Sequence, residues 1–150
     1  MAEATAEFTG LTEFPRYLTL LFEVDALFCN DDRHLNNIAV IEQDGKYDYC
    51  PVFDNGAGLF SNTQIMQMDI NPKALIAALI ARPFNTTFTR QMNSARSLYG
   101  RQLVMPRFGK AEVRSALTPL LAFYAERDRG IIADRVTECI LMRRKDFEGD

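Results

Sequence analysis

The sequence predicts a mainly α-helical domain with one short β-hairpin. Apolar residues recur at helical spacing over 13–28 and in several segments beyond residue 70. A β-branched run and an alternating aromatic run flank Asp44-Gly45, a strong signal for a tight hairpin turn. The 150 residues are 47% apolar and 25% charged, enough for one core, and they contain no linker or internal repeat. We therefore expect residues 1–150 to form a single domain.

The first part of the chain is expected to place a polar loop between a helix and the hairpin. Residues 1–10 are predicted to be a disordered leader, followed by a helix over 13–28. The loop covers 30–37, which is dense in Asp and Asn and has no apolar period. The hairpin pairs roughly 38–42 with 47–53, and a glycine-containing loop over 54–61 follows it.

The remainder is predicted to be helical. Asn71-Pro72 combines an N-cap with proline at the first helical position and opens a helix to about Ala81. Thr86 or Thr87 caps the next helix, which stops at Gly100. A helix is expected over 109–116. Thr118-Pro119 should either kink this helix or begin a new one that runs to Glu126, and Asp128 should cap the last helix.

Composition excludes several classes of protein. The net charge of -3 and the lack of a basic block give no reason to expect nucleic acid as a partner, and Arg143-Arg144-Lys145 is predicted to be a solvated last turn. The apolar runs are too short for a bilayer and the N-terminus has no secretory core, which predicts a cytoplasmic protein. The cysteines are predicted to be buried and reduced, without a disulfide or a zinc site: Cys29, Cys50 and Cys139. Four methionines are predicted to fill the core: Met66, Met68, Met92 and Met105.

The polar loops on either side of the hairpin contain the candidate site. Asn37 precedes the first strand and Asp54 follows the second, so the hairpin should bring them together. Amide and carboxylate oxygens are ligands that Mg²⁺ accepts. Asp32 lies on the same loop as Asn37, and phosphoryl transfer uses a carboxylate beside such metal ligands. The kinase pattern Asp-x-x-x-x-Asn, then Asp-x-Gly after a short hairpin, matches Asp32 to Asn37 and Asp54-Asn55-Gly56.

The segment Asp32-Arg33-His34-x-x-Asn37-Ile38 resembles the catalytic loop of phosphatidylinositol kinases and HipA-type serine/threonine kinases. The tail from Tyr49 to Gly56 is more similar to bacterial HipA-like proteins, and the similarity covers about residues 14–61. The resemblance implies that Asp32 is the catalytic Asp and that His34 organises the loop near the phosphates. It also implies that Asn37 and Asp54 hold Mg²⁺ beside ATP and that Arg33 is a structural or phosphate-facing cation. Gly56 would let the backbone turn behind Asp54.

The same resemblance shows what this sequence lacks. A kinase holds ATP between two lobes, and the smaller lobe supplies a glycine-rich loop and a lysine on a strand. Neither feature precedes Asp32, and the first lysine is Lys46. We therefore expect a protein-kinase-like C-terminal lobe whose N-lobe is absent. It would bind ATP only with an N-lobe supplied by a longer protein or by another polypeptide.

Three hypotheses about function follow. In the first, the lobe belongs to an enzyme that transfers the ATP γ-phosphoryl group to a protein Ser or Thr hydroxyl, with a phosphatidylinositol-type lipid as the alternative substrate. In the second, it is a non-catalytic module that binds a partner kinase or regulatory protein, or forms a homodimer through the exposed lobe face. In the third, it is a metal-dependent phosphohydrolase, which the lack of a second histidine or a larger carboxylate cluster disfavours.

Overall fold

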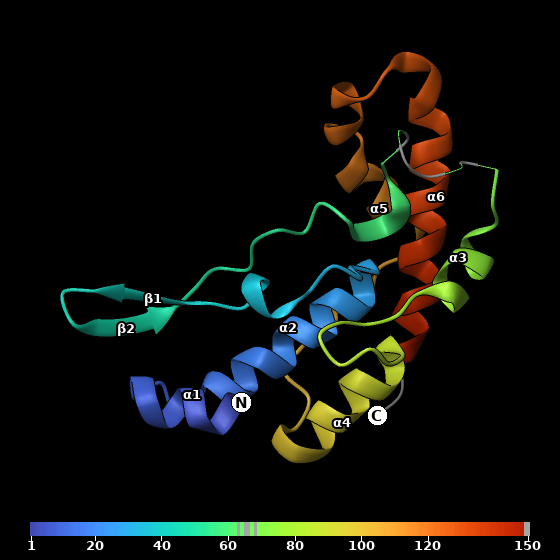
Figure 1. The fold of residues 1–150 in the computed structure, drawn as a ribbon. Helices are drawn as coiled ribbons and strands as arrows, with labels where there is room; N and C mark the ends of the chain where they lie inside the picture. Colours follow the sequence, from blue (N-terminus) through green and yellow to red (C-terminus); the bar gives the residue numbers. More distant parts are fainter. Residues whose placement is uncertain (63, 65–66, 68, 149–150) are drawn as a thin grey trace.

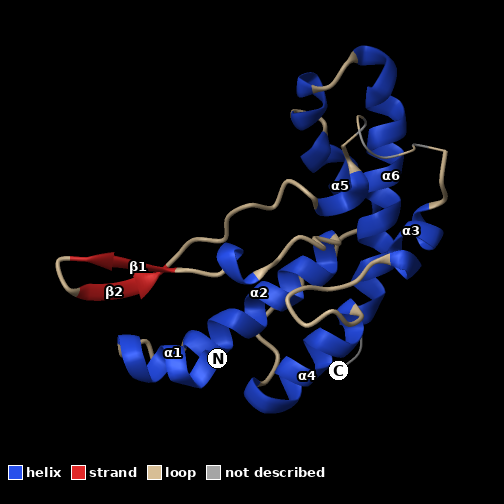
Figure 2. Cartoon of the chain, viewed as in Figure 1, coloured by secondary structure: helices blue, strands red, loops and turns tan. Residues whose placement is uncertain are grey.

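The computed structural model describes residues 1–62, 64, 67 and 69–148, and these are mainly helical with one antiparallel two-stranded sheet (Figure 1). The α-helices are α1 (Ala2–Thr9), α2 (Phe14–Phe28), α3 (Pro72–Ala78), α4 (Phe88–Tyr99), α5 (Lys110–Leu117) and α6 (Glu126–Arg144). The sheet pairs β1 (Val40–Gln43) with β2 (Lys46–Tyr49). Figure 2 shows the hairpin projecting away from the larger group of helices. The predicted combination of helices and one hairpin is confirmed.

Helix α2 lies at the centre of the hydrophobic core. Residues from α2, or its C-cap Cys29, take part in each of three buried clusters: Leu18 with Leu21 and Phe22; Ala26 and Leu27 with Ala81, Phe88, Met92 and Phe147; and Cys29 with Phe60 and Cys139. The helix ends at Cys29, whose φ of 54° is left-handed. The polar loop over 30–37 therefore begins at a position that the core fixes.

Buried polar contacts attach other elements to α2. Arg96 of α4 pairs with the fully buried Glu23, with Nε 2.6 Å from Oε1. Arg143 of α6 donates from Nε to the carbonyl oxygen of Ala26 at 2.6 Å. That carbonyl lies in the last turn of α2, where no helical N–H is available to it. The Arg143 side chain is buried in making this contact. The prediction that Arg143 belongs to a solvated last turn is wrong.

Residues Ala2–Thr9 form α1, so the prediction of a disordered leader over residues 1–10 is wrong. The helix ends at Gly10, which has a φ of 77°. Two contacts fix it to distant parts of the chain: the Phe8 ring lies 5.8 Å from the Tyr47 ring, and the Tyr99 hydroxyl donates to Glu3 at 3.3 Å. An isolated helix of this length is marginal in water, so packing against its neighbours accounts for its stability.

The hairpin turn has the predicted position and the strands are shorter than predicted. Asp44 and Gly45 both have positive φ, 53° and 74°, as a two-residue type I′ turn requires. Pairing stops at Val40 opposite Tyr49. Beyond Tyr49 the Cys50 carbonyl accepts from the Tyr17 hydroxyl at 2.6 Å, and Pro51 has no N–H to continue the ladder.

Two predicted helix starts are confirmed and a third is wrong. Asn71 Oδ1 accepts from the Lys73 amide at 2.8 Å, and Thr87 Oγ1 accepts from the Arg90 amide at 3.2 Å, as N-caps do. Helix α6 instead begins at Glu126, which puts Asp128 inside its first turn. An acidic side chain there still stabilises the positive end of the helix dipole.

Other boundaries differ in detail. Helix α3 ends at Ala78, and Ala81 bridges to Thr86 in a short turn. After α5 the chain forms only a 3₁₀ turn over Leu120–Phe123, so Thr118-Pro119 ends the helix. Met92 and Met105 pack in or against the core as predicted, whereas Met66 and Met68 lie outside the described residues. No helix in the described part of the chain combines the length and apolar character needed to cross a membrane.

The cysteines give a direct test of this packing. Cys29 and Cys139 are fully buried, and burial raises the pKa of the Cys29 thiol to about 12 and that of Cys139 to about 11. Cys50 lies outside the core and is half-buried. Because the thiolate is the reactive form, a disulfide reagent at roughly pH 8 should titrate only Cys50 quickly in the native protein. All three thiols should react in denaturant, and equally fast reaction in the native state would contradict the core assignment.

Candidate functional site

The side chain of Arg33 is the centre of the polar loops. It is fully buried, and Nε and Nη2 donate to the two carboxylate oxygens of Asp25 at 2.9 and 3.0 Å. Nη1 donates to the carbonyl oxygens of Asn37, at 3.0 Å, and Phe53, at 2.7 Å. Nη2 also donates to Asn55 Oδ1 at 2.6 Å. A guanidinium has five N–H donors, and all of them are used here.

These bonds bring together the two loops predicted to form the site. Asn37 precedes the hairpin and Phe53 directly precedes Asp54, yet their carbonyl oxygens bind the same nitrogen of Arg33. The backbone on the two sides of the hairpin is thus held together, as the order of the elements predicted. Since Arg33 has no exposed surface and no unused donor, it is a structural cation, and the predicted alternative of a phosphate-facing cation is wrong.

Asp25 is an essential part of this cluster that the sequence patterns did not identify. It lies in the last turn of α2, is 1% exposed, and also accepts from Asn30 Nδ2 at 2.9 Å. Burial raises the pKa of Asp25, and the hydrogen bonds from Arg33 and Asn30 oppose that shift. A carboxylate at the negative end of a helix dipole is unfavourable by itself. Its position was therefore a signal that a cation should lie nearby.

Asn37 is held so that its amide oxygen stays available. The side chain is buried, and Nδ2 donates to the Asp32 carbonyl oxygen at 3.0 Å. The same nitrogen lies 3.4 Å from His34 Nε2, which can accept when the ring proton is on Nδ1. No described residue donates to Asn37 Oδ1, which leaves this oxygen for a metal ion. His34 therefore touches the predicted metal ligand and lies where a loop organiser would act.

The Asp32 side chain lies at the edge of the cluster. It is about half exposed, with its Oδ1 3.9 Å from Arg82 Nη1. Its backbone carbonyl accepts from the His34 amide at 2.8 Å as well as from Asn37. The main chain of Asp32 is thus fixed while its carboxylate stays open to solvent. The neighbouring Asp31 is partly buried, and burial, together with the charge of Asp32, raises the pKa of Asp31.

A shallow hollow lies beside Asp32. It lies between the loop that follows α2 and the segment that carries Arg82, and it is lined by His34, Leu35, Asn36, Arg82, Pro83 and Asn85. Its lining is mixed, with amide and cationic side chains beside leucine and proline. The carboxylate of Asp32 approaches this hollow through its contact with Arg82.

Asp54 is exposed and has an unusual backbone conformation. Its φ is 54°, in the left-handed region, and among the described residues its carboxylate has no hydrogen-bond or ion-pair partner. The expected turn behind Asp54 is present at Gly56, closed by the Gly58 amide donating to the Asn55 carbonyl at 3.1 Å, but the left-handed residue is Asp54 itself. Aspartate tolerates this region better than most residues, and such strain commonly occurs at functional sites.

The donor set fits Mg²⁺. Asn37 Oδ1 and the Asp54 carboxylate are two oxygens on loops that share the contacts of Arg33. Mg²⁺ usually takes only one or two protein carboxylates and completes its shell with water and substrate phosphates. Within the described ranges, no group of three His, Cys, Asp or Glu side chains forms a metal cluster. Binding of Mg²⁺ together with a phosphorylated ligand at these loops stays a prediction.

The Asp25–Arg33 pair should dominate the stability of this region. Replacing Arg33 by Leu leaves the buried Asp25 without its partner, and breaking such a pair typically costs ~3–5 kcal/mol of unfolding free energy. The matched control is Arg16→Leu, because Arg16 forms an exposed pair with Glu13 that should contribute less than about 1 kcal/mol. Urea unfolding of both variants measures the difference, and equally small losses would contradict the assigned role of Arg33.

Comparison with known proteins identifies no relative of this chain. The chain matches no protein-family model. It matches no curated protein and no solved structure either. The similarity of the loops around Asp32 and Asp54 to kinases consequently stays a prediction.

Proposed function

We propose that this chain is the C-terminal lobe of a HipA-like, ATP- and Mg²⁺-dependent kinase that phosphorylates a Ser or Thr hydroxyl of a protein. One observation supports the proposal most. Arg33 uses all five of its donors to join α2, the Asp32–Asn37 loop and the loop that leads into Asp54. Phosphoryl transfer needs a catalytic carboxylate and metal ligands in one place, and this contact holds together the loops that contain them.

Each residue would have a separate task in that reaction. The half-exposed Asp32 carboxylate would orient the attacking hydroxyl and accept its proton. Asn37 Oδ1 and Asp54 would hold Mg²⁺, which when bound neutralises charge on the phosphate oxygens. His34 would keep the Asn37 amide in place through the 3.4 Å contact between Nε2 and Nδ2. Positioning and electrostatics would thus account for most of the rate, as in other phosphoryl transfers.

The proposal requires a second lobe for ATP. The sequence before Asp32 supplies no glycine-rich loop and no lysine, and α1 and α2 occupy most of it. An N-lobe, whether in a longer protein or on a partner polypeptide, would cover the nucleotide. Without it, the lobe should bind Mg²⁺ through Asn37 and Asp54 and should bind ATP weakly.

A non-catalytic interaction module is the second candidate, and the exposed apolar side chains beside the hairpin favour it. Ile41 lies on the hairpin that projects from the helices, and Val52 and Phe53 lie in the segment that follows β2; they are 42%, 38% and 38% exposed (Figure 1). Such side chains can bind a regulatory protein or a second copy of the chain. Two results together would favour this candidate. The unaltered chain would bind neither nucleotide nor Mg²⁺, and Asp54→Ala would still bind the partner.

Metal binding can be measured on this chain. With Mg²⁺ and ATP at about tenfold above their dissociation constant, binding should add roughly 1.4 kcal/mol of stability, a rise of about 3–5 °C in melting temperature. Asp54→Ala should abolish this rise because it removes a ligand. Asp48→Ala, which removes another exposed carboxylate on the hairpin, should keep it. Equal shifts in both variants would show that Asp54 is not a ligand.

Phosphoryl transfer tests the role of Asp32. In the protein that includes its ATP-holding lobe, Asp32→Ala should lower transfer of labelled γ-phosphate to protein by at least about 100-fold, the usual contribution of general acid–base catalysis. Binding of ATP and Mg²⁺ should change little, because the metal ligands remain. Asp31→Ala is the adjacent control. Undiminished transfer in Asp32→Ala would refute the assignment.

A further inference from the structure

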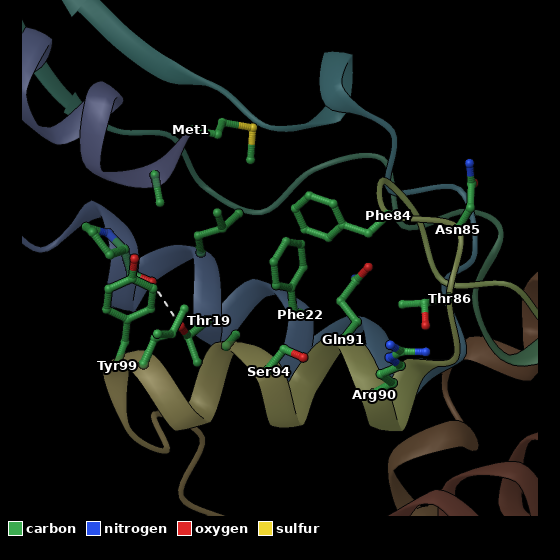
Figure 3. Close-up of a pocket in the computed structure, with 15 residues that line it drawn as sticks. Met1, Thr19, Phe22, Phe84, Asn85, Thr86, Arg90, Gln91, Ser94 and Tyr99 are labelled. Carbon is green, nitrogen blue, oxygen red and sulfur yellow. Dashed lines mark hydrogen bonds between the residues drawn. The ribbon is translucent and has the colours of Figure 1, made fainter.

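A separate pocket of about 650 Å³ lies between α2, α4 and the loop over 84–86 (Figure 3). Its walls are mostly apolar and include Pro15, Leu18, Phe22, Phe84, Ala95 and Leu98. Only Asn85 lines both this pocket and the hollow beside Asp32. Its size is in the range that encloses small organic ligands, and neither the kinase motif nor its proposed mechanism uses it.

Gln91 is a buried polar group of this pocket with one unmet hydrogen-bonding requirement. It is 4% exposed, and its Nε2 donates to the Arg82 carbonyl oxygen at 2.9 Å. That bond sets the orientation of the amide. Its Oε1 is buried and has no partner among the described residues. Figure 3 shows the Gln91 side chain reaching from α4 toward the loop that carries Phe84 and Thr86. A buried acceptor of this kind is costly unless a donor reaches it.

The surroundings of Gln91 define the rest of a ligand. The rings of Phe22 and Phe84 meet edge to face with centroids 5.9 Å apart, although Phe84 is 58% exposed. A planar ring placed against them would cover this exposed aromatic surface. Arg90 lies next to Gln91 along α4, and its guanidinium has no ion-pair partner among the described residues. A guanidinium in that position suits a carboxylate.

We propose that this pocket binds a small planar aromatic acid that carries an N–H or O–H donor. The donor bonds to Gln91 Oε1, the ring packs against Phe22 and Phe84, and the acid group faces Arg90. The proposal stands independently of kinase activity, because it uses no residue of the Asp32 and Asp54 loops.

The test uses the fluorescence anisotropy of indole-3-acetate, which has a ring N–H and a carboxylate. The protein contains no tryptophan, so the indole signal comes from the probe alone. Anisotropy should rise saturably with protein concentration. The 1-methyl analogue, which lacks the N–H, should bind about fivefold more weakly, as expected for one hydrogen bond. Indole without the acid group should also bind more weakly.

Two pairs of measurements locate the site. Ser94→Phe fills the pocket from α4 and should abolish binding, whereas Ser97→Phe, at an exposed position of α4 that does not line the pocket, should preserve it. Gln91→Met removes the acceptor and should make the two indole probes bind equally. Thermal melting shows whether each variant is folded. If Gln91→Met does not fold, the comparison of Ser94→Phe with Ser97→Phe provides the test.

Three results would overturn the proposal. The first is the absence of a saturable rise for indole-3-acetate. The second is equal binding by Ser94→Phe and Ser97→Phe, which would place the probe elsewhere. The third is equal binding of the methylated and unmethylated probes to the unaltered protein, which would mean that water alone satisfies Gln91 Oε1.

Discussion

The buried guanidinium of Arg33 is the interaction on which the candidate site depends. A buried cation is costly to remove from water unless a counter-ion and hydrogen-bond acceptors replace the lost hydration. Asp25 supplies the charge, and the carbonyls of Asn37 and Phe53 with the amide of Asn55 supply the remaining acceptors. Because Asp25 belongs to the central core helix, the positions of both polar loops are set by the hydrophobic core. The loops cannot separate without leaving N–H donors of the buried Arg33 guanidinium without acceptors.

Helix α2 combines this polar role with the main apolar one. Its apolar residues belong to two of the buried clusters and its C-cap Cys29 to the third, while Glu23 and the Ala26 carbonyl bind Arg96 and Arg143 from α4 and α6. Arginine suits these contacts because its planar donors satisfy several acceptors at once and remain charged when buried. The helix that leads into the candidate site is therefore anchored by both apolar and polar contacts. This rigidity is what a site that works by positioning requires.

Local patterns in the sequence predicted the local features well. Helical periodicity identified α2, and the Asp44-Gly45 pair identified the turn. Asn71 and Thr87 were recognisable as caps because each side chain bonds to a backbone amide only two or three residues further along the chain. The Asp25–Arg33 pair was missed because burial of a charge is decided by tertiary packing. Helix α1 was missed for the same reason, since a short helix depends on distant contacts such as Phe8 with Tyr47. The spacing of Asp32, Asn37 and Asp54 in the sequence indicated which loops form the candidate site. The structural role of Arg33 became clear only from its contacts, which use all five of its N–H donors.

Paramagnetic NMR with Mn²⁺ tests most directly whether the two loops form one metal site. Mn²⁺ accepts the same oxygen ligands as Mg²⁺ and broadens the signals of nearby nuclei. The account predicts that the backbone amide signals of Asn37 and Asp54 broaden together at the lowest Mn²⁺ concentrations, while the exposed Asp48 on the same hairpin is unaffected. Broadening that appears first at scattered acidic residues, or at Asp54 without Asn37, would contradict a shared site.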